Sequence, residues 1–67
     1  MIKTILRLDA VRAATGLTRG SLYQDIKAGR FPRPVKITAR GRAVGWLEEE
    51  VAAYQEARIA ARDSRAA

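Results

Sequence analysis

The sequence predicts a small, mainly α-helical domain with one short β-hairpin. Three observations lead to this prediction: two short helical segments that end at glycines, two prolines that interrupt the helical pattern, and an alternating apolar segment after them. The 67 residues leave room for one domain with one small core. The chain has no Cys and no His, so it lacks disulfides and the usual ligands of a zinc finger. We therefore expect packing alone to hold the fold, with no metal and no cofactor.

The first two helices are expected on either side of a tight turn. Asp9 is a candidate cap for the first helix, and Gly16 suits the left-handed backbone position that ends a helix. Thr18 is a good N-cap for a second helix, which should span residues 19–28 and stop at Gly29. A helix, a short turn with glycine and a second helix form the helix-turn-helix pattern.

The second helix has an apolar side and a polar side. Leu22 and Ile26 are four residues apart and share the side that should face the core. The polar side and its flanks hold Gly20, Gln24, Lys27, Arg19, Ser21 and Tyr23. For Tyr23 the pattern fits a half-buried packing residue and an exposed contact residue equally well.

The segment after the second helix predicts a β-hairpin. Its two prolines exclude a helix and favour extended backbone. Residues 35–38 alternate apolar and polar side chains, residues 39–42 provide a turn, and residues 43–46 can return as the partner strand. A lone two-stranded hairpin is marginal in water, so we expect Phe31 and Trp46 to pack it against the helices.

A third helix, expected from about Leu47, should cover the core. Glutamates at 48–50 lie in its first turn, where carboxylates stabilise the positive end of the helix dipole. Three consecutive side chains point in different directions, so we do not expect a metal site there. Leu47, Val51 and Tyr54 share one face of this helix, which is the spacing of a helix that packs on a core.

The end of the chain offers little to bury. From residue 60 on, it consists of Ala, Arg, Asp and Ser, so we expect a domain over residues 1–59 and a frayed or disordered tail over residues 60–67. No apolar run is long enough for a membrane span or a signal-peptide core. The expected location is the bacterial cytoplasm, in association with the nucleoid.

The charge of the chain is unevenly distributed. The net charge is +6, with +8 on residues 1–46 and −2 on residues 47–67. The positive part coincides with the predicted helix-turn-helix and hairpin, which indicates attraction to the phosphates of a nucleic acid. An enzyme is not expected, because general acid–base chemistry lacks its usual groups: there is no His, no Cys and no convergent carboxylate pair. The chain also has no phosphate-binding glycine loop.

Together these elements predict a winged helix-turn-helix that binds double-stranded DNA. The second helix would enter the major groove, and the hairpin tip would reach the backbone or the adjacent minor groove. Gln24 could make a bidentate contact with adenine, and Arg19 or Lys27 could contact guanine or phosphate. The residues expected to contact DNA are Thr18, Arg19, Gly20, Ser21, Tyr23, Gln24, Lys27, Arg30, Lys36, Arg40, Gly41 and Arg42.

Three motifs are specific when taken together in this order and spacing: TGLTRGSLY, GRFPRPVKI and GWLEEEV. Within residues 5–59 they make the chain closely resemble the AlpA family of phage and genomic-island regulators. The resemblance implies a MerR-like winged helix and DNA binding. It also implies a role in transcriptional activation or in excisionase-type control of integrase direction.

The chain departs from the family pattern within the second helix. The family often has Ser-Thr-Ile-Tyr-Arg where this chain has Gly-Ser-Leu-Tyr-Gln at residues 20–24, and often an apolar residue where this chain has Asp25. The residues that keep the DNA-facing roles implied by the family are Arg19, Ser21, Tyr23 and Lys27. The role of Gln24 is open, and Asp25 either pairs with a nearby basic side chain or lies at the edge of the core.

Two further alternatives stay open at this point. A structured RNA is a less favoured ligand than DNA, because the chain has few aromatic residues for base stacking. The chain could also be an adaptor that recruits a recombinase, such as a phage integrase, or RNA polymerase through its last helix. Because one short helix contacts only a few base pairs, we expect several copies to bind DNA cooperatively.

Overall fold

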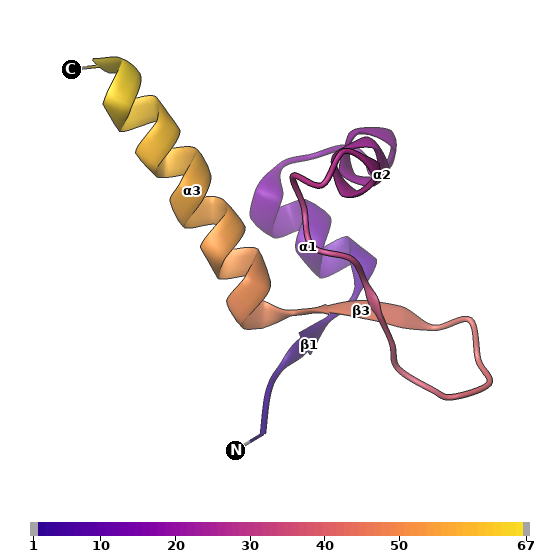
Figure 1. The fold of residues 1–67 in the computed structure, drawn as a ribbon. Helices are drawn as coiled ribbons and strands as arrows, with labels where there is room; N and C mark the ends of the chain where they lie inside the picture. Colours follow the sequence, from indigo (N-terminus) through magenta and orange to yellow (C-terminus); the bar gives the residue numbers. More distant parts are fainter. Residues whose placement is uncertain (1, 67) are drawn as a thin grey trace.

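The computed structural model describes residues 2–66, which form three helices and a small antiparallel sheet (Figure 1). In chain order the elements are β1 (Ile5–Leu6), α1 (Leu8–Thr15), α2 (Arg19–Lys27), β2 (Val35–Lys36), β3 (Val44–Leu47) and α3 (Glu48–Ala66). The prediction of a mainly α-helical fold with a β-hairpin is confirmed, and the arrangement is compatible with a winged helix-turn-helix.

Helix α1 begins earlier than the sequence suggested and ends where predicted. Its N-cap is Arg7, which has extended backbone angles and no capping side-chain hydrogen bond, so the prediction of Asp9 as the cap is wrong. Asp9 instead lies in the first turn, where its charge still favours the positive end of the helix. Gly16 ends the helix with a left-handed φ of 74°, and its N–H donates to the carbonyl of Arg12 at 2.8 Å.

Helix α2 starts at its predicted cap and stops within a residue of its predicted end. The hydroxyl of Thr18 accepts a hydrogen bond from the N–H of Ser21 at 3.2 Å, and the carbonyl of Thr18 accepts from Leu22 at 2.9 Å. The helix ends at Lys27, with Ala28 as its C-cap, and Gly29 follows with a positive φ. The predicted helix-turn-helix is therefore present, with a turn of three residues between α1 and α2.

The hairpin is confirmed, and a third strand joins it. Strand β3 lies in the middle of the sheet, with β1 and β2 antiparallel on either side. Strand β2 is shorter than expected and pairs with β3 through Val35 opposite Gly45 and Lys36 opposite Val44. A Cβ at Gly45 would lie against the side chain of Ile5 and 2.9 Å from the carbonyl of Leu6, so glycine here lets β1 approach.

Helix α3 begins one residue later and extends further than predicted. Leu47 is the last residue of β3, because it pairs with Ile5 of β1, and the helix starts at Glu48. The helix then continues to Ala66, past residue 59, where we expected it to fray. The side chains of residues 60–64 are all exposed. The division of the chain at residue 59 stays a prediction.

Every helix and the hairpin contribute to one core. Its buried side chains, at most 3% exposed, are Val11, Leu22, Phe31, Trp46 and Val51. The predictions that Phe31 and Trp46 are core residues are confirmed. The Phe31 ring packs in T-shaped geometry with the rings of Trp46 and Tyr54, at centroid distances of 6.4 and 4.7 Å. The indole N–H of Trp46 donates to the carbonyl of Pro32 at 3.0 Å, so the proline segment is attached to the middle strand.

Candidate nucleic-acid interface

Helix α2 exposes the polar side that the sequence predicted. Leu22 is fully buried and Ile26 is half-buried, so these two residues face the core. The six residues of the polar side and its flanks are all exposed: Arg19, Gly20, Ser21, Tyr23, Gln24 and Lys27. The helix thus has hydrogen-bonding and cationic groups available on one side.

The exposure of Tyr23 fits both of its interpretations, so its role stays a prediction. Its side chain is 39% exposed and is not part of the core cluster. The guanidinium of Arg19 lies 5.9 Å from the centroid of the Tyr23 ring, which is within the range of a cation–π contact. This contact places the two side chains next to each other on the exposed part of α2.

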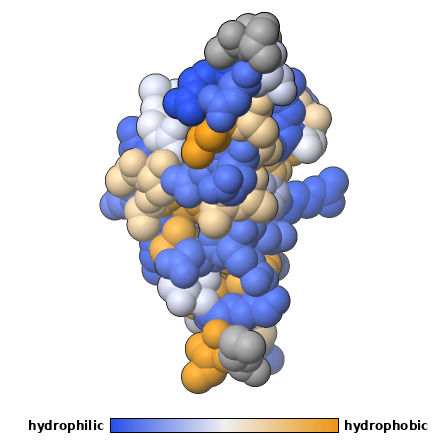
Figure 2. Space-filling view, turned by 90° about the vertical axis from the view of Figure 1, so that its left-hand side faces the viewer, coloured by the Kyte–Doolittle hydropathy of each residue, from blue (hydrophilic) through white to orange (hydrophobic). Residues whose placement is uncertain are grey.

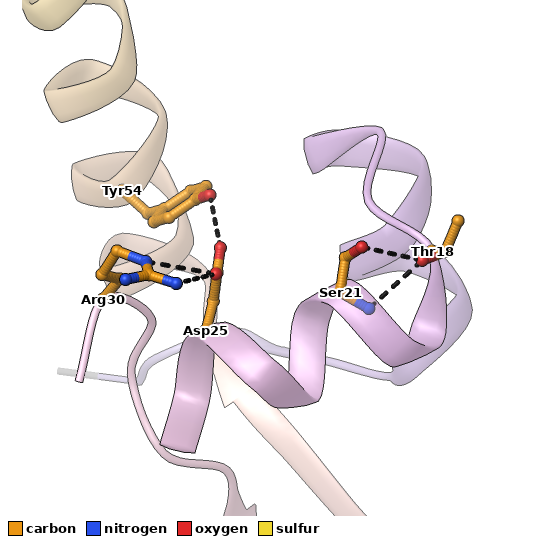
Figure 3. Close-up of polar contacts among 5 residues, drawn as sticks. All are labelled: Thr18, Ser21, Asp25, Arg30 and Tyr54. Carbon is orange, nitrogen blue, oxygen red and sulfur yellow. Dashed lines mark hydrogen bonds and ion pairs between the residues drawn. The ribbon is translucent and has the colours of Figure 1, made fainter. Parts of the chain in front are cut away.

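The first turn of α2 is fixed by a small hydrogen-bond network. The Thr18 hydroxyl donates to the Ser21 hydroxyl oxygen at 3.1 Å, in addition to accepting from the Ser21 N–H (Figure 3). Thr18 and Ser21 are both exposed. Their mutual hydrogen bonds set the orientation in which α2 leaves the turn.

The hairpin carries the second group of predicted contact residues. Lys36 lies on β2, and Arg40, Gly41 and Arg42 lie in the loop between β2 and β3; all four are exposed. One backbone hydrogen bond, from Ile37 N–H to the Ala43 carbonyl at 3.0 Å, closes this loop. In the view of Figure 1, α2 and the hairpin tip both lie on the side of the molecule away from α3.

Among the predicted contact residues in the described chain, Arg30 alone pairs with a carboxylate. Its Nε and one terminal nitrogen donate to the Oδ1 atom of Asp25, at 3.2 and 3.1 Å. The hydroxyl of Tyr54, on α3, donates to the Oδ2 atom of Asp25 at 3.3 Å (Figure 3). Both interpretations of Asp25 therefore hold, because it pairs with a basic side chain and its own side chain is only 19% exposed.

We call Asp25, Arg30 and Tyr54 the Asp25 cluster. Burial of the Tyr54 ring raises the pKa of its hydroxyl, and the negative charge of Asp25 raises it further. Sequence reasoning placed Tyr54 on the core face of the last helix but missed its contact with α2. The available signal was an acid at an otherwise apolar position, which needs a polar partner.

The charges on the two sides of the molecule differ in their pairing. Within the described part of the chain, no carboxylate pairs with the cationic groups of α2 and the hairpin, namely Arg19, Lys27, Lys36, Arg40 and Arg42. On the other side, Lys3 pairs with Glu49 at 2.6 Å, and Arg62 with Asp63 at 2.9 Å. Figure 2 shows the side with α3 as mostly hydrophilic, with hydrophobic side chains in small separate patches. Arg7, Arg12, Arg33 and Arg58 also have no carboxylate partner in the described residues. Five of these nine cationic side chains therefore lie on α2 and the hairpin, which we call the basic side.

Residues 2–66 contain no group of acidic residues that could hold a metal ion. None of their helices is both long and apolar enough to cross a membrane.

These features define a class: a small, basic helix-turn-helix protein with an arginine-tipped hairpin. The family model described as "Prophage CP4-57 regulatory protein (AlpA)" matches residues 4–59, and the chain belongs to this family of phage regulatory proteins. A relative, the "Uncharacterized protein ORF88" of Enterobacteria phage P4, is 40% identical over 57 residues. The match covers 85% of this chain and 62% of the relative, so the chain spans under two thirds of that relative's length. No solved structure matches the chain.

Proposed function

We propose that this protein is a sequence-specific regulator that binds double-stranded DNA in a phage or other mobile element. One observation carries the proposal: the exposed polar side of α2 and the arginine-tipped hairpin together hold five cationic side chains with no acidic partner in the described chain. Such a surface attracts phosphate. Membership of a phage regulatory family supports the same function.

In the proposed complex, α2 lies in the major groove. Gln24 contacts a base edge, and Arg19 and Lys27 contact guanine or phosphate. The other residues of the exposed side and its cap, Thr18, Gly20, Ser21 and Tyr23, complete the contact surface of the helix. Lys36 and the hairpin tip, Arg40-Gly41-Arg42, lie against the backbone or the neighbouring minor groove, which holds the register of the protein on the duplex.

The same complex serves two proposed forms of regulation. As a transcription factor, the protein would act with RNA polymerase; as an excisionase, it would bend or mark DNA for a phage integrase. Both forms use cooperative binding of several copies, because a nine-residue helix spans only a few base pairs. Both forms place the protein in the bacterial cytoplasm, on the nucleoid, in a MerR-like mode of binding.

Selection of bound sequences from random duplex DNA, followed by affinity measurements across salt concentrations, tests the proposal. The logarithm of the affinity should fall steeply with the logarithm of the salt concentration, because each neutralised phosphate releases counterions. Gln24→Ala should relax the preference at one base pair by about 1–3 kcal/mol. Arg42→Ala should weaken binding to all DNA sequences alike, and it should reduce the slope of log affinity against log salt concentration by about 0.9.

Arg62→Ala is the matched control for Arg42→Ala. It removes the same charge from α3, where Arg62 already pairs with Asp63, and should leave the salt slope unchanged. Salt-insensitive binding, or equal affinity for duplex RNA, would contradict the proposed function. A footprint over a single half-site without cooperativity would contradict the proposed assembly of several copies.

An adaptor function is the second candidate, and the length of α3 favours it. The helix continues to Ala66, and the side chains of residues 56–64 are all exposed, so this part of α3 offers a surface to a protein partner. If α3 recruits an integrase or a polymerase, Glu56→Ala should abolish regulation in cells and leave DNA affinity unchanged. If Glu56→Ala leaves regulation intact and Gln24→Ala abolishes it, DNA recognition is the main function.

A further inference from the structure

The Asp25 cluster connects α2 directly to α3. Each carboxylate oxygen of Asp25 has its own partner: Oδ1 accepts from Arg30, and Oδ2 accepts from the Tyr54 hydroxyl at 3.3 Å. Figure 3 shows Asp25 between Arg30 and Tyr54, with Tyr54 extending from α3. Because Asp25 is only 19% exposed, water screens its contact with the Tyr54 hydroxyl less than it would at an open surface. The Arg30 side chain is 64% exposed, so its ion pair with Asp25 is screened more strongly.

The partners of Asp25 are themselves held in place. The Tyr54 ring meets the buried Phe31 ring at 4.7 Å, so the Tyr54 hydroxyl has a fixed position. The backbone carbonyl of Asp25 accepts hydrogen bonds from the N–H groups of Arg30 and Phe31, at 2.8 and 3.2 Å. The chain after α2 is thus attached to the same residue that contacts α3.

Helical geometry relates Asp25 to the exposed side of α2. Successive residues of an α-helix are about 100° apart, so Tyr23 and Lys27, each two residues from Asp25, lie about 160° from it around the axis. A contact that fixes Asp25 against α3 therefore fixes the direction in which Tyr23 and Lys27 face the solvent. A rotation of about 20° would move side-chain atoms 5 to 6 Å from the axis by about 2 Å. That displacement exceeds the width of the hydrogen-bond distance range.

We propose that Asp25 and Tyr54 are positioning residues that set the rotation of α2, and so determine which bases its side chains contact. Arg30 acts in this cluster through Asp25 and not as a phosphate contact, which revises its predicted role. The inference rests on the proposed function, because it concerns how the DNA-contacting side of α2 is oriented.

Two conservative substitutions test the positioning role. Tyr54→Phe keeps the ring and removes the hydroxyl, and Asp25→Asn keeps the shape and removes the charge. Each variant should fold and lose roughly 3- to 10-fold of its discrimination between the selected sequence and a single-base variant, the size of one hydrogen bond. Their salt slopes should equal that of the wild type, because no phosphate contact is lost.

Gln55→Ala is the matched control. The Gln55 side-chain N–H donates to the carbonyl of Ala14 at 2.8 Å, so this variant also loses a hydrogen bond from α3, but one that reaches α1 and not α2. Its thermal stability should fall while its sequence discrimination stays at the wild-type level. Equal loss of discrimination in Gln55→Ala and Tyr54→Phe would overturn the proposal, because general destabilisation would then explain both.

Arg30→Gln separates the two roles of Arg30. If Arg30 acts through Asp25, the substitution leaves the salt slope unchanged and has little further effect in an Asp25→Asn background. Arg30 would instead be a phosphate contact if Arg30→Gln reduced the salt slope by about 0.9 and weakened binding to all DNA sequences equally, both in the wild type and in Asp25→Asn. That result would overturn its assigned role.

A measurement on the DNA-free protein tests the contact itself. In a titration followed by tyrosine absorbance, Asp25→Asn should lower the pKa of Tyr54 toward its ordinary value, because it removes the neighbouring negative charge. An unchanged Tyr54 titration overturns the proposal whatever the DNA results are.

The DNA selection experiment separates failure of the proposed function from failure of the positioning role. If the wild type selects no sequence, both fail. If the wild type selects a sequence and both variants keep the same preference, only the positioning role fails.

Discussion

The turn between α1 and α2 and the tip of the hairpin are both short connections, but they are held in different ways. Hydrogen bonds to Gly16, Leu17 and Thr18 fix the turn from both sides, and Leu17 is half-buried against the core. In the described chain, the loop from residue 38 to 42 is exposed throughout and is closed by one backbone hydrogen bond. Base contacts need precise placement, whereas attraction between an arginine and a phosphate tolerates movement. The difference matches the roles proposed for the two regions.

The largest expected effect comes from a buried leucine of the helix-turn-helix. Leu22→Ala should lower the free energy of unfolding by about 2–5 kcal/mol, because it leaves a cavity in the core. In a domain of this size that is most of the total stability. Ile37→Ala, at a hairpin residue that is 39% exposed, should cost less than ~1 kcal/mol. Urea unfolding compares the two; similar losses would show that the hairpin also carries the stability of the fold.

An intermediate effect is expected from two glycines of the helix-turn-helix. Gly16→Ala should destabilise the protein by about 1–2 kcal/mol, because its φ of 74° is unfavourable for a residue with a Cβ. Gly20→Ala should stabilise it by up to ~1 kcal/mol, because Gly20 lies within α2 and nothing lies within 4 Å of the added Cβ. Thermal unfolding measures both. A stabilising Gly16→Ala would show that the turn is not fixed in its left-handed form.

The smallest effect concerns alkaline pH. The folded protein raises the pKa of Tyr54 above its ordinary value of 10.0, mainly through burial. The neutral hydroxyl is therefore favoured in the folded state, so this contribution to stability is complete below pH 10 and is lost as the pH rises through the higher folded value. Glu49 raises the pKa of Lys3 in the same direction from 10.5.

Tyr54→Phe tests this pH dependence, and Arg40→Ala in the hairpin tip is the comparison. In urea unfolding between pH 8 and 11, the variant should lose part of the alkaline decline in stability, and the part due to Lys3 should remain. Arg40→Ala in the hairpin tip should leave the decline at its wild-type size. A decline that is unchanged in Tyr54→Phe would show that the Tyr54 hydroxyl has the same pKa in the folded and unfolded chains.

Local signals in the sequence predicted most of the fold. The ends of the two helices are marked by Gly16, Thr18 and Gly29. Each of these residues acts on the backbone within one helical turn, so its effect can be inferred without a structure. The large aromatic residues Phe31 and Trp46 identified the core for a similar reason, because few other side chains could fill it. Exposure of the polar side of α2 also followed from its helical period.

Contacts between distant segments were beyond such reasoning. The pairing of β1 with β3 joins residues 5–6 to residues 46–47 and depends on the missing Cβ of Gly45. The contact between Asp25 and Tyr54 spans 29 positions and depends on where α3 lies relative to the last turn of α2. Asp9 was a plausible cap by type, but the helix starts at Leu8, directly after β1, and this leaves Arg7 at the N-cap.

The fully buried Trp46 gives the protein an intrinsic optical probe. It is the sole tryptophan of the chain, and its N–H is bonded to Pro32 within the packed centre of the molecule. Its fluorescence should shift to longer wavelength when the core opens, so unfolding of every variant above can be followed without a label. Because Trp46 faces the core and not the basic side, its emission should stay constant when DNA is added. Trp46 fluorescence can therefore distinguish a variant that no longer folds from one that folds but no longer binds DNA.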